Sequence, residues 1–345
     1  MFFFASLLSL SLLPTFSFSQ QVPPNSLALA YSLTTSTSFP FPSATQSPQD
    51  TQSFIVSNWS LGKGRIQDGA ENIAFVNDPF PNKPPSSPVP ESPFTGPVLQ
   101  VTYPQGSFSH ETGGTQFYNL WNTSDGASFG SMMISYEVAF DNGFDWVKGG
   151  KLPGLRGGLD PTGCSGGNKA DGEACFSTRL MWRKGGSGEI YAYIPSPNGL
   201  CDVKNIICNT DFGISMSRGS FGFITGQWSR ITLLIQLNNP PNIANGLVRL
   251  YFNDLLATEQ TGLQFRSSAS LAADGMYFST FFGGSDPSWA TPNLTHTYYR
   301  NLHMWGGSSP SNLTGEVVES GVSRTMTSHL GLFSVLAPIL YFWVF

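Results

Sequence analysis

The sequence predicts an all-β protein on three observations. Only 11% of its 345 residues are charged and 14% are aromatic, while Gly (37) and Pro (25) are abundant, as in secreted β proteins with many turns. Short segments of alternating apolar and polar residues follow one another, with Gly, Asn, Asp and Pro between them. No segment before the C-terminal tail has a long helical period. Because two packed sheets bury alternate residues of each strand, we expect a concanavalin-like β-jelly-roll sandwich whose concave outer face forms a ligand groove.

The predicted strands define one domain at residues 98–306. In chain order they are 98–103, 116–121, 132–140, the hairpin 175–194, 228–237, 247–252, 276–282 and 296–305. The domain is followed by a linker at 307–329.

A Ser/Thr/Pro-rich and loop region, residues 20–97, precedes the domain. Within it we expect an extended lead-in at 22–50 that can carry O-linked glycans, and an edge strand from the apolar run at 54–59. The proline-rich stretch at 81–97 is expected to form a loop, since proline cannot pair inside a sheet. This region is therefore predicted to be an appendage of the domain.

Both ends of the chain are apolar. Residues 1–19 end in small residues before polar Gln20, which favours a secretory signal peptide over a transmembrane anchor, although no Lys or Arg stands near the start. Residues 330–345 form an uncharged tail after a spacer with small residues, which favours a glycolipid (GPI) anchor signal over a plain tail anchor or an ordinary hydrophobic terminus. We therefore expect an extracellular protein. Four N-glycosylation sequons agree with secretion: Asn58, Asn122, Asn293 and Asn312.

Four cysteines lie close together in the chain: Cys164, Cys175, Cys201 and Cys208. In an oxidising compartment they allow three pairings, and short loops favour Cys164 with Cys175 and Cys201 with Cys208. Zinc is the competing interpretation, but there is no Cys-x-x-Cys pair and the sequence has only four His. We expect disulfides that staple the loops beside the hairpin.

The hairpin at 175–194 carries the candidate site. Side chains alternate along a strand, so Phe176, Thr178, Leu180 and Trp182 form the core side, and the opposite side carries Ser177, Arg179, Met181 and Arg183. Closing the hairpin at the Gly-rich turn 184–188 pairs residue 183 with 189, 181 with 191 and 179 with 193. Tyr191 and Tyr193 then join Arg179 on an exposed polar face that is poor in carboxylates, and Lys151 can reach it from the preceding segment. The simpler alternative is a solvated sheet face that the tyrosines merely cover.

A net charge of −5 gives no general attraction for polyanions and argues against nucleic-acid binding. Recognition of an acidic polymer must then come from a local cluster, for which the candidates are Lys148, Lys151, Arg156, Arg179 and Arg183. Gln116 and Asn119 are further candidates, as hydrogen-bond partners of sugar hydroxyls. For Lys148, Arg156, Gln116 and Asn119 the alternative is ordinary solvation.

Three motifs stand in order along the domain: Gly-Gly-Lys-Leu-Pro-Gly at 149–154, Ser-Thr-Arg-Leu-Met-Trp at 177–182 and Tyr-Ala-Tyr at 191–193. With the stretch at 277–286 they resemble polysaccharide lyase family 14, which includes alginate lyases and glucuronan lyases, and its secreted fungal-type members. Residues 20–95 and the tail fall outside the likeness. The resemblance implies a β-jelly roll, cleavage of an acidic polysaccharide by β-elimination, and an active site formed by the matching residues Lys151, Ser177, Arg179, Tyr191 and Tyr193.

The chemistry of β-elimination asks for the same residue types. Removing the C5 proton of a uronate creates negative charge beside its carboxylate, so Arg179 is expected to clamp the carboxylate and Lys151 to add positive charge. We expect a tyrosine, 191 or 193, to act as acid and base with its pKa lowered by a neighbouring cation, with a desolvated Lys151 as the alternative base. Ser177 and Arg183 are expected to bind the sugar. No metal or cofactor is needed.

Two other classes remain open from sequence. A glycoside hydrolase needs two facing carboxylates, and although Glu137, Asp141, Glu173 and Glu189 exist, no Glu-x-Asp-x-x-Glu strand signature is present. A non-catalytic carbohydrate-binding surface protein can also use tyrosines and arginines on a sheet. The choice between glucuronan and alginate, and between endo and exo action, stays open; we expect a monomer that meets the membrane only through a lipid anchor.

Overall fold

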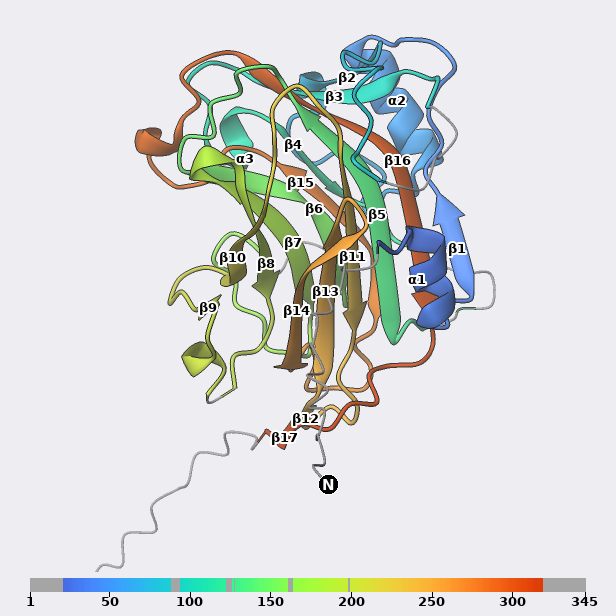
Figure 1. Ribbon diagram of the computed structural model, residues 1–345, viewed down its shortest axis with the longest axis vertical. Helices are drawn as coiled ribbons and strands as arrows, with labels where there is room; N and C mark the ends of the chain where they lie inside the picture. Colours follow the sequence, from blue (N-terminus) through green and yellow to red (C-terminus); the bar gives the residue numbers. More distant parts are fainter. Residues whose placement is uncertain are drawn as a thin grey trace, which may run out of the picture.

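The computed structural model describes residues 21–87, 94–121, 126, 128–160, 164–197 and 199–318. Two large antiparallel sheets pack face to face in it (Figure 1). The eight-stranded sheet has the order β14-β13-β11-β5-β16-β3-β2, with β1 paired to β16. Its strands are β1 (Thr35–Ser38), β2 (Ile73–Val76), β3 (Val98–Tyr103), β5 (Ser131–Phe140), β11 (Ser229–Gln236), β13 (Gly246–Phe252), β14 (Leu255–Leu263) and β16 (Thr295–Gly307).

The seven-stranded sheet has the order β4-β15-β6-β7-β8-β10-β9. Its strands are β4 (Thr115–Tyr118), β6 (Gly149–Gly157), β7 (Phe176–Arg183), β8 (Ser187–Tyr193), β9 (Ile206–Ile207), β10 (Ile214–Gly222) and β15 (Ala273–Thr280). A small sheet pairs β12 (Ile243–Ala244) with β17 (Glu316–Val317). The helices are α1 (Pro24–Ala30), α2 (Pro48–Asn58) and α3 (Ser109–Thr112), with short 3-10 turns at Ala70–Asn72, Lys184–Gly186, Leu200–Asp202 and Pro287–Trp289.

The main hydrophobic core lies between the two sheets and follows the alternation along the strands. Leu180 and Ile190 enter it from the seven-stranded sheet, and Ile134 and Leu233 from the eight-stranded sheet; all four are fully buried. Trp182 completes an aromatic cluster there, with its ring centroid 5.3 Å from that of Phe282. Each such side chain contributes about 1.5–3 kcal/mol by leaving water. The predicted β-jelly-roll sandwich is therefore confirmed, and each strand segment predicted within the domain at 98–306 overlaps an observed strand.

The N-terminal region is part of the sandwich, contrary to the prediction of an extended lead-in. β1 pairs with β16, and β2 pairs with β3. The apolar run at 54–59, expected as an edge strand, lies almost entirely in helix α2. Pro48 opens this helix and the Ser47 side chain accepts a hydrogen bond from the Asp50 N–H at 3.3 Å, so a cap placed well before the run decides its conformation. Among the described residues, no helix has the length and apolar character needed to span a bilayer.

The hairpin register differs from the predicted one by two residues. β7 and β8 pair Met181 with Glu189, Arg179 with Tyr191 and Ser177 with Tyr193. The reason is a tight 3-10 turn, in which Gly185 has a φ of 70°, so that β8 already begins at Ser187. Because a shift of two residues keeps every side chain on its own face, the predicted core and polar sides hold. The two favoured disulfides, Cys164–Cys175 and Cys201–Cys208, are confirmed.

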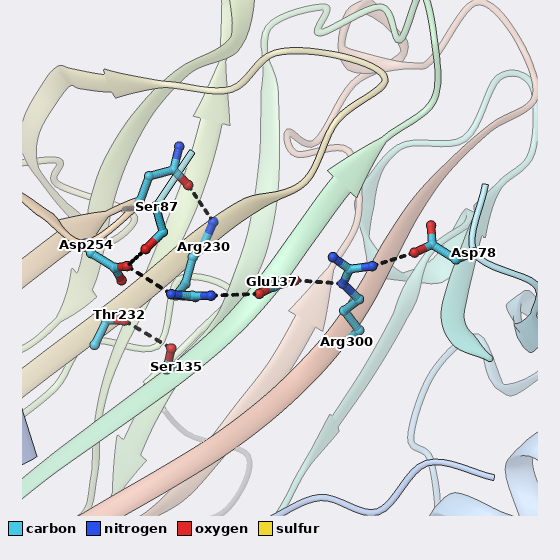
Figure 2. A network of polar contacts seen from close by, with 9 residues as sticks. Asp78, Ser87, Ser135, Glu137, Arg230, Thr232, Asp254 and Arg300 are labelled. Carbon is cyan, nitrogen blue, oxygen red and sulfur yellow. Dashed lines mark hydrogen bonds and ion pairs between the residues drawn. The ribbon is translucent and has the colours of Figure 1, made fainter. Parts of the chain in front are cut away.

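A chain of ion pairs lies on the outer face of the eight-stranded sheet (Figure 2). Glu137 of β5 accepts hydrogen bonds from Arg230 of β11 (NH2 to Oε1, 3.1 Å) and from Arg300 of β16 (Nε to Oε2, 2.6 Å). Arg230 also donates to Asp254 at 2.9 Å, and Arg300 pairs with Asp78. All five side chains are at least nine-tenths buried. Each buried arginine in this network therefore meets two carboxylates.

Candidate active site

The candidate site lies on the outer face of the seven-stranded sheet, on the side away from the core. Residues paired across antiparallel strands share a face. Lys151 of β6 pairs with Met181 of β7, and Arg179 pairs with Tyr191 of β8. Tyr193 follows on the same face of β8, since the side chains alternate. The fold thus brings Lys151, Arg179, Tyr191 and Tyr193 together.

Arg179 is buried without full compensation of its hydrogen-bond donors. The side chain is 1% exposed, and NH1 donates to Ser279 Oγ at 3.0 Å. Among the residues that the structure describes, its Nε and NH2 have no hydrogen-bond partner. The guanidinium carbon lies 4.4 Å from the ring centroid of Tyr277 and 5.8 Å from that of Tyr193. A buried donor without a partner costs free energy, and an arginine fork is suited to a carboxylate, so this side chain is built to receive an anion.

Lys151 lies beside this fork and contacts no carboxylate in the described part of the chain. Its Nζ is 3.2 Å from the Met181 thioether sulfur and 3.8 Å from the ring centroid of Tyr191. Burial, and then the positive charges of Arg179 and Arg183, hold the pKa of Lys151 well below its usual range, against a weaker opposing effect of Glu189. An amine in this environment is able to lose its proton far more readily than an ordinary lysine.

The two tyrosines are held by backbone amides. Tyr191 OH accepts a hydrogen bond from the Gly213 N–H at 3.0 Å, and Tyr193 OH accepts one from Gly167 at 3.3 Å. Burial, followed by the neighbouring Tyr193, raises the pKa of Tyr191, and Arg179 offsets only part of this effect. The expectation of a cation-lowered pKa is therefore wrong for Tyr191, because desolvation is larger than the attraction of the guanidinium. Its phenol keeps its proton at neutral pH.

A disulfide-closed loop covers part of this face, which is why the polar face is not exposed as predicted. Tyr191 and Tyr193 are only 6% and 4% exposed. Ser177, expected to bind the sugar, is 1% exposed and donates its hydroxyl to the Cys164 carbonyl at 2.7 Å. Tyr277 OH donates to Ser165 Oγ at 3.1 Å. Ser177 therefore fastens the loop that begins at Cys164.

One buried carboxylate lies on this hairpin face, which was predicted to be poor in carboxylates. Glu189 is 0% exposed and accepts hydrogen bonds from Arg183 Nε at 2.9 Å, Arg218 Nε at 2.6 Å and Ser215 Oγ at 2.7 Å. Arg183, predicted to bind substrate, is thus already paired. Sequence reasoning missed this group because Arg218 comes from β10, a strand that was not predicted.

Gln116 lies in β4 and Asn119 directly follows that strand, and of these two polar candidates Gln116 is the one on this face. Its Oε1 accepts from Ser279 Oγ at 3.2 Å and its Nε2 donates to Asp68 at 3.0 Å. Ser279 thereby links Gln116 to Arg179. Asn119 is an odd number of residues from Gln116, so its side chain points to the inner side of the sheet. There it is 5% exposed and donates to the Trp59 carbonyl at 2.7 Å. It is therefore removed from the site.

The two outlying cations have different surroundings. Arg156 is 3% exposed and is engaged by Asp274 and by the carbonyls of Gly158 and Asp160, so it is a structural residue rather than a free charge. Lys148 is exposed and donates to Ser288. Of these two cations, Lys148 is the one that a polymer can reach from solvent.

Ser279 and Tyr277 were not predicted to be site residues. The alternation within 277–286 contains the signal, since Tyr277 and Ser279 fall on the face opposite core residue Phe278. What the alternation could not show is that β15 pairs with β6 at Gly154. A side chain at Gly154 would meet the Thr178 carbonyl at 2.1 Å, so this glycine lets β6 lie against β7 beside Arg179.

The four acidic residues considered for hydrolysis do not form a facing pair. Glu137 belongs to the ion-pair chain on the other sheet, and Glu189 is held by two arginines. Asp141 accepts hydrogen bonds from His296 and Tyr298, and Glu173 is exposed in the loop after Cys164. No group of three or more His, Cys, Asp or Glu residues suited to hold a metal occurs among the described residues.

The jelly roll and its cationic, phenol-lined sheet face agree with a polysaccharide lyase. Residues 91–302 match the family described as polysaccharide lyase 14. The marine PL-14 alginate lyase from Aplysia kurodai is similar over 78% of this chain and 100% of its own, with 30% identity and a TM-score of 0.62. The chain therefore belongs to polysaccharide lyase family 14.

Other solved structures share the fold. The alginate lyase vAL-1 from Chlorella virus is 25% identical over 65% of this chain and 90% of its own, with a TM-score of 0.51. Alginate lyase Aly36B, at 19% identity and a TM-score of 0.55, covers 80% of this chain and 98% of its own. Among curated proteins, none matches this chain. The family assignment establishes that the protein is a polysaccharide lyase.

Proposed function

We propose that the protein cleaves a 1,4-linked polyuronate, glucuronan or alginate, by β-elimination. The observation that carries the proposal is the buried guanidinium of Arg179. Within the described part of the chain it has two donors without partners, and the neighbouring Lys151 contacts no carboxylate. A uronate carboxylate supplies the acceptors that Arg179 lacks, and it does so at the place where the reaction develops negative charge.

The proposed reaction begins at C5 of the sugar bound by Arg179. A base takes the C5 proton, the electron pair of that bond forms a C4–C5 double bond, and the C4–O4 bond breaks as an acid protonates O4. The lowered pKa of Lys151 suits the base, because the neutral amine can accept the proton. The raised pKa of Tyr191 suits a phenol that stays protonated and donates. This assignment reverses the sequence-based preference for a tyrosine base.

The substrate is tested with purified protein on glucuronan, polymannuronate and polyguluronate. The proposal expects products with unsaturated ends, measured by their ultraviolet absorbance, on at least one of these polymers. Reducing ends that form without that absorbance would show hydrolysis instead, and binding without any cleavage would show a carbohydrate-binding protein. Alginate is the substrate named for the similar Aplysia kurodai enzyme, and the assay decides whether this chain shares it.

We also propose that the protein works outside the cell. The sequons at Asn58, Asn293 and Asn312 stand at exposed positions, where a glycan can be attached. The signal peptide at 1–19, the tail at 330–345 and Asn122 lie outside the described residues. Release of the protein from intact cells by a phosphatidylinositol-specific phospholipase would support the lipid anchor, and retention after that treatment would count against it.

A further inference from the structure

A second cationic group lies on the same sheet face as the candidate active site, at Arg218 in β10. The pairing of β10 with β8 is interrupted between Met216 and Phe221. Within this bulge Ser217 and Gly219 have φ values of 52° and 84°, and the Thr258 hydroxyl holds Ser217 by a hydrogen bond of 2.6 Å. Bulges redirect side chains, and the residue between the two left-handed positions is Arg218.

The buried carboxylate of Glu189 directs Arg218 onto the sheet face. Arg218 Nε donates to Glu189 Oε2 at 2.6 Å, and NH2 lies 3.4 Å from Ser215 Oγ. Glu189 is 0% exposed, whereas 42% of the Arg218 side chain is exposed. One side of the guanidinium is therefore anchored, and the rest remains accessible from solvent.

Glu189 has enough partners without Arg218. Arg183 donates to its Oε1 through two nitrogens, and the Ser215 hydroxyl donates to its Oε2. Two arginines around one carboxylate leave this group with one net positive charge. Because Glu189 has enough partners without Arg218, the positive charge of Arg218 is free to attract an anion.

The strand order places this charge beyond the sugar that Arg179 would hold. Arg179 lies in β7, and β10 is two strands away across β8. At the usual strand spacing, the two backbones are roughly 10 Å apart across the sheet. A single sugar ring held at Arg179 does not extend that far, whereas a chain of linked uronates does.

We propose that Arg218 binds the carboxylate of a second uronate unit, so that the β10 bulge gives the enzyme a preference for chains over short products. The proposal rests on the proposed polyuronate function. Arg218 acts here as a specificity-determining residue, and the carboxylate class it recognises is that of the polymer.

The test compares wild type with Arg218→Gln and Arg218→Lys in the full-length protein. Arg249→Gln is the matched control, because Arg249 is ion-paired to Glu259 on the other sheet. KM and kcat are measured on long polyuronate and on trisaccharides, and binding of hexasaccharides is measured by calorimetry. We expect Arg218→Gln to raise KM for the polymer and Kd for the hexasaccharide about tenfold with little change in kcat. The loss should be smaller on trisaccharides than on the polymer, because only some bound positions of a trisaccharide put a second uronate at Arg218, and Arg218→Lys should recover part of the loss.

The outcomes below distinguish failure of the Arg218 proposal from failure of the proposed function. An unchanged polymer KM and hexasaccharide Kd in Arg218→Gln would overturn the inference, as would an equal loss in Arg249→Gln or an equal loss on a carboxyl-esterified polymer. If wild type binds hexasaccharide but produces no unsaturated ends, the proposed function fails, and the binding contrast between wild type and Arg218→Gln still decides the role of Arg218. If wild type neither binds nor cleaves any polyuronate, both proposals fail.

Discussion

The outer faces of the two sheets both bury cationic side chains, but they compensate them differently. On the eight-stranded sheet, Arg230 and Arg300 share Glu137 and each has a further carboxylate (Figure 2). On the seven-stranded sheet, Arg179 has one hydroxyl partner and Lys151 contacts a thioether and an aromatic ring. The first face is complete as folded, while Arg179 and Lys151 on the second have no anionic partner among the described residues.

This difference distinguishes a structural charge from a functional one. A buried ion pair offsets its own desolvation when each partner is satisfied, so it needs nothing from outside the chain. A buried guanidinium with unpartnered donors destabilises the free protein and is stabilised when a carboxylate arrives. The contrast can be tested with substitutions on each face, by measuring whether each one changes the stability of the protein or its turnover.

The largest expected effect comes from replacing Arg179 with Met. We expect kcat/KM on polyuronate to fall by about 10³-fold or more, near 4 kcal/mol, since the charge that develops at the carboxylate loses its fork. The melting temperature should not fall, because the thioether removes donors that have no partner among the described residues. Kinetics and thermal unfolding are measured on the same preparation. A strongly lowered melting temperature would show that Arg179 is a structural residue and would remove the contrast.

The opposite result is expected for Glu137→Gln on the other sheet. Loss of this carboxylate leaves two buried arginines short of a partner, so the free energy of unfolding should fall by about 3 kcal/mol, as measured in urea. Turnover by the folded protein should change little. The control is Glu259→Gln, whose ion pair with Arg249 is partly exposed and should contribute less than about 1 kcal/mol.

The two disulfides extend this comparison, with smaller expected effects. Replacing either pair by Ala should cost about 2–3 kcal/mol of stability, since both close short loops. The Cys164/Cys175 pair closes the loop whose Cys164 carbonyl and Gly167 N–H form hydrogen bonds with Ser177 and Tyr193. We expect loss of the Cys164/Cys175 disulfide to lower kcat roughly tenfold, because the Tyr193 phenol then loses its hydrogen bond from Gly167. The Cys201/Cys208 variant should keep most of its activity. Equal activity in the two variants would show that the loop does not position the site.

Side-chain alternation was enough to predict which residues face the site and which face the core. It placed Arg179 and Tyr191 on one side although the predicted register was two residues off, because an even shift preserves faces. Alternation says nothing about what packs on a face. The loop fastened by Ser177 and the carboxylate of Glu189, reached from β10, depend on contacts between distant segments.

Local signals also failed where a distant residue decides the conformation. The apolar run at 54–59 is long enough for a strand, yet the cap at Ser47 and the proline at 48 start a helix that continues through it. Asn119 was grouped with Gln116 although an odd spacing puts the two on opposite faces. The family motifs identified the chemistry, and the pKa directions of Lys151 and Tyr191 then depended on burial that only the fold reveals.

The smallest expected effect concerns how much the buried amine of Lys151 lowers the stability of the free protein. Its folded pKa is lowered, so between that value and the usual lysine pKa of about 10.4 the unfolded chain binds more protons than the folded chain. The contribution of Lys151 to stability therefore becomes less unfavourable as the pH rises across this window. Lys151→Met removes the buried amine and should stabilise the protein at neutral pH by on the order of 1 kcal/mol. Its advantage over wild type should shrink as the pH is raised, measured by urea unfolding at several pH values. An advantage that is absent or constant with pH would mean that Lys151 is as well compensated as the arginines on the other sheet.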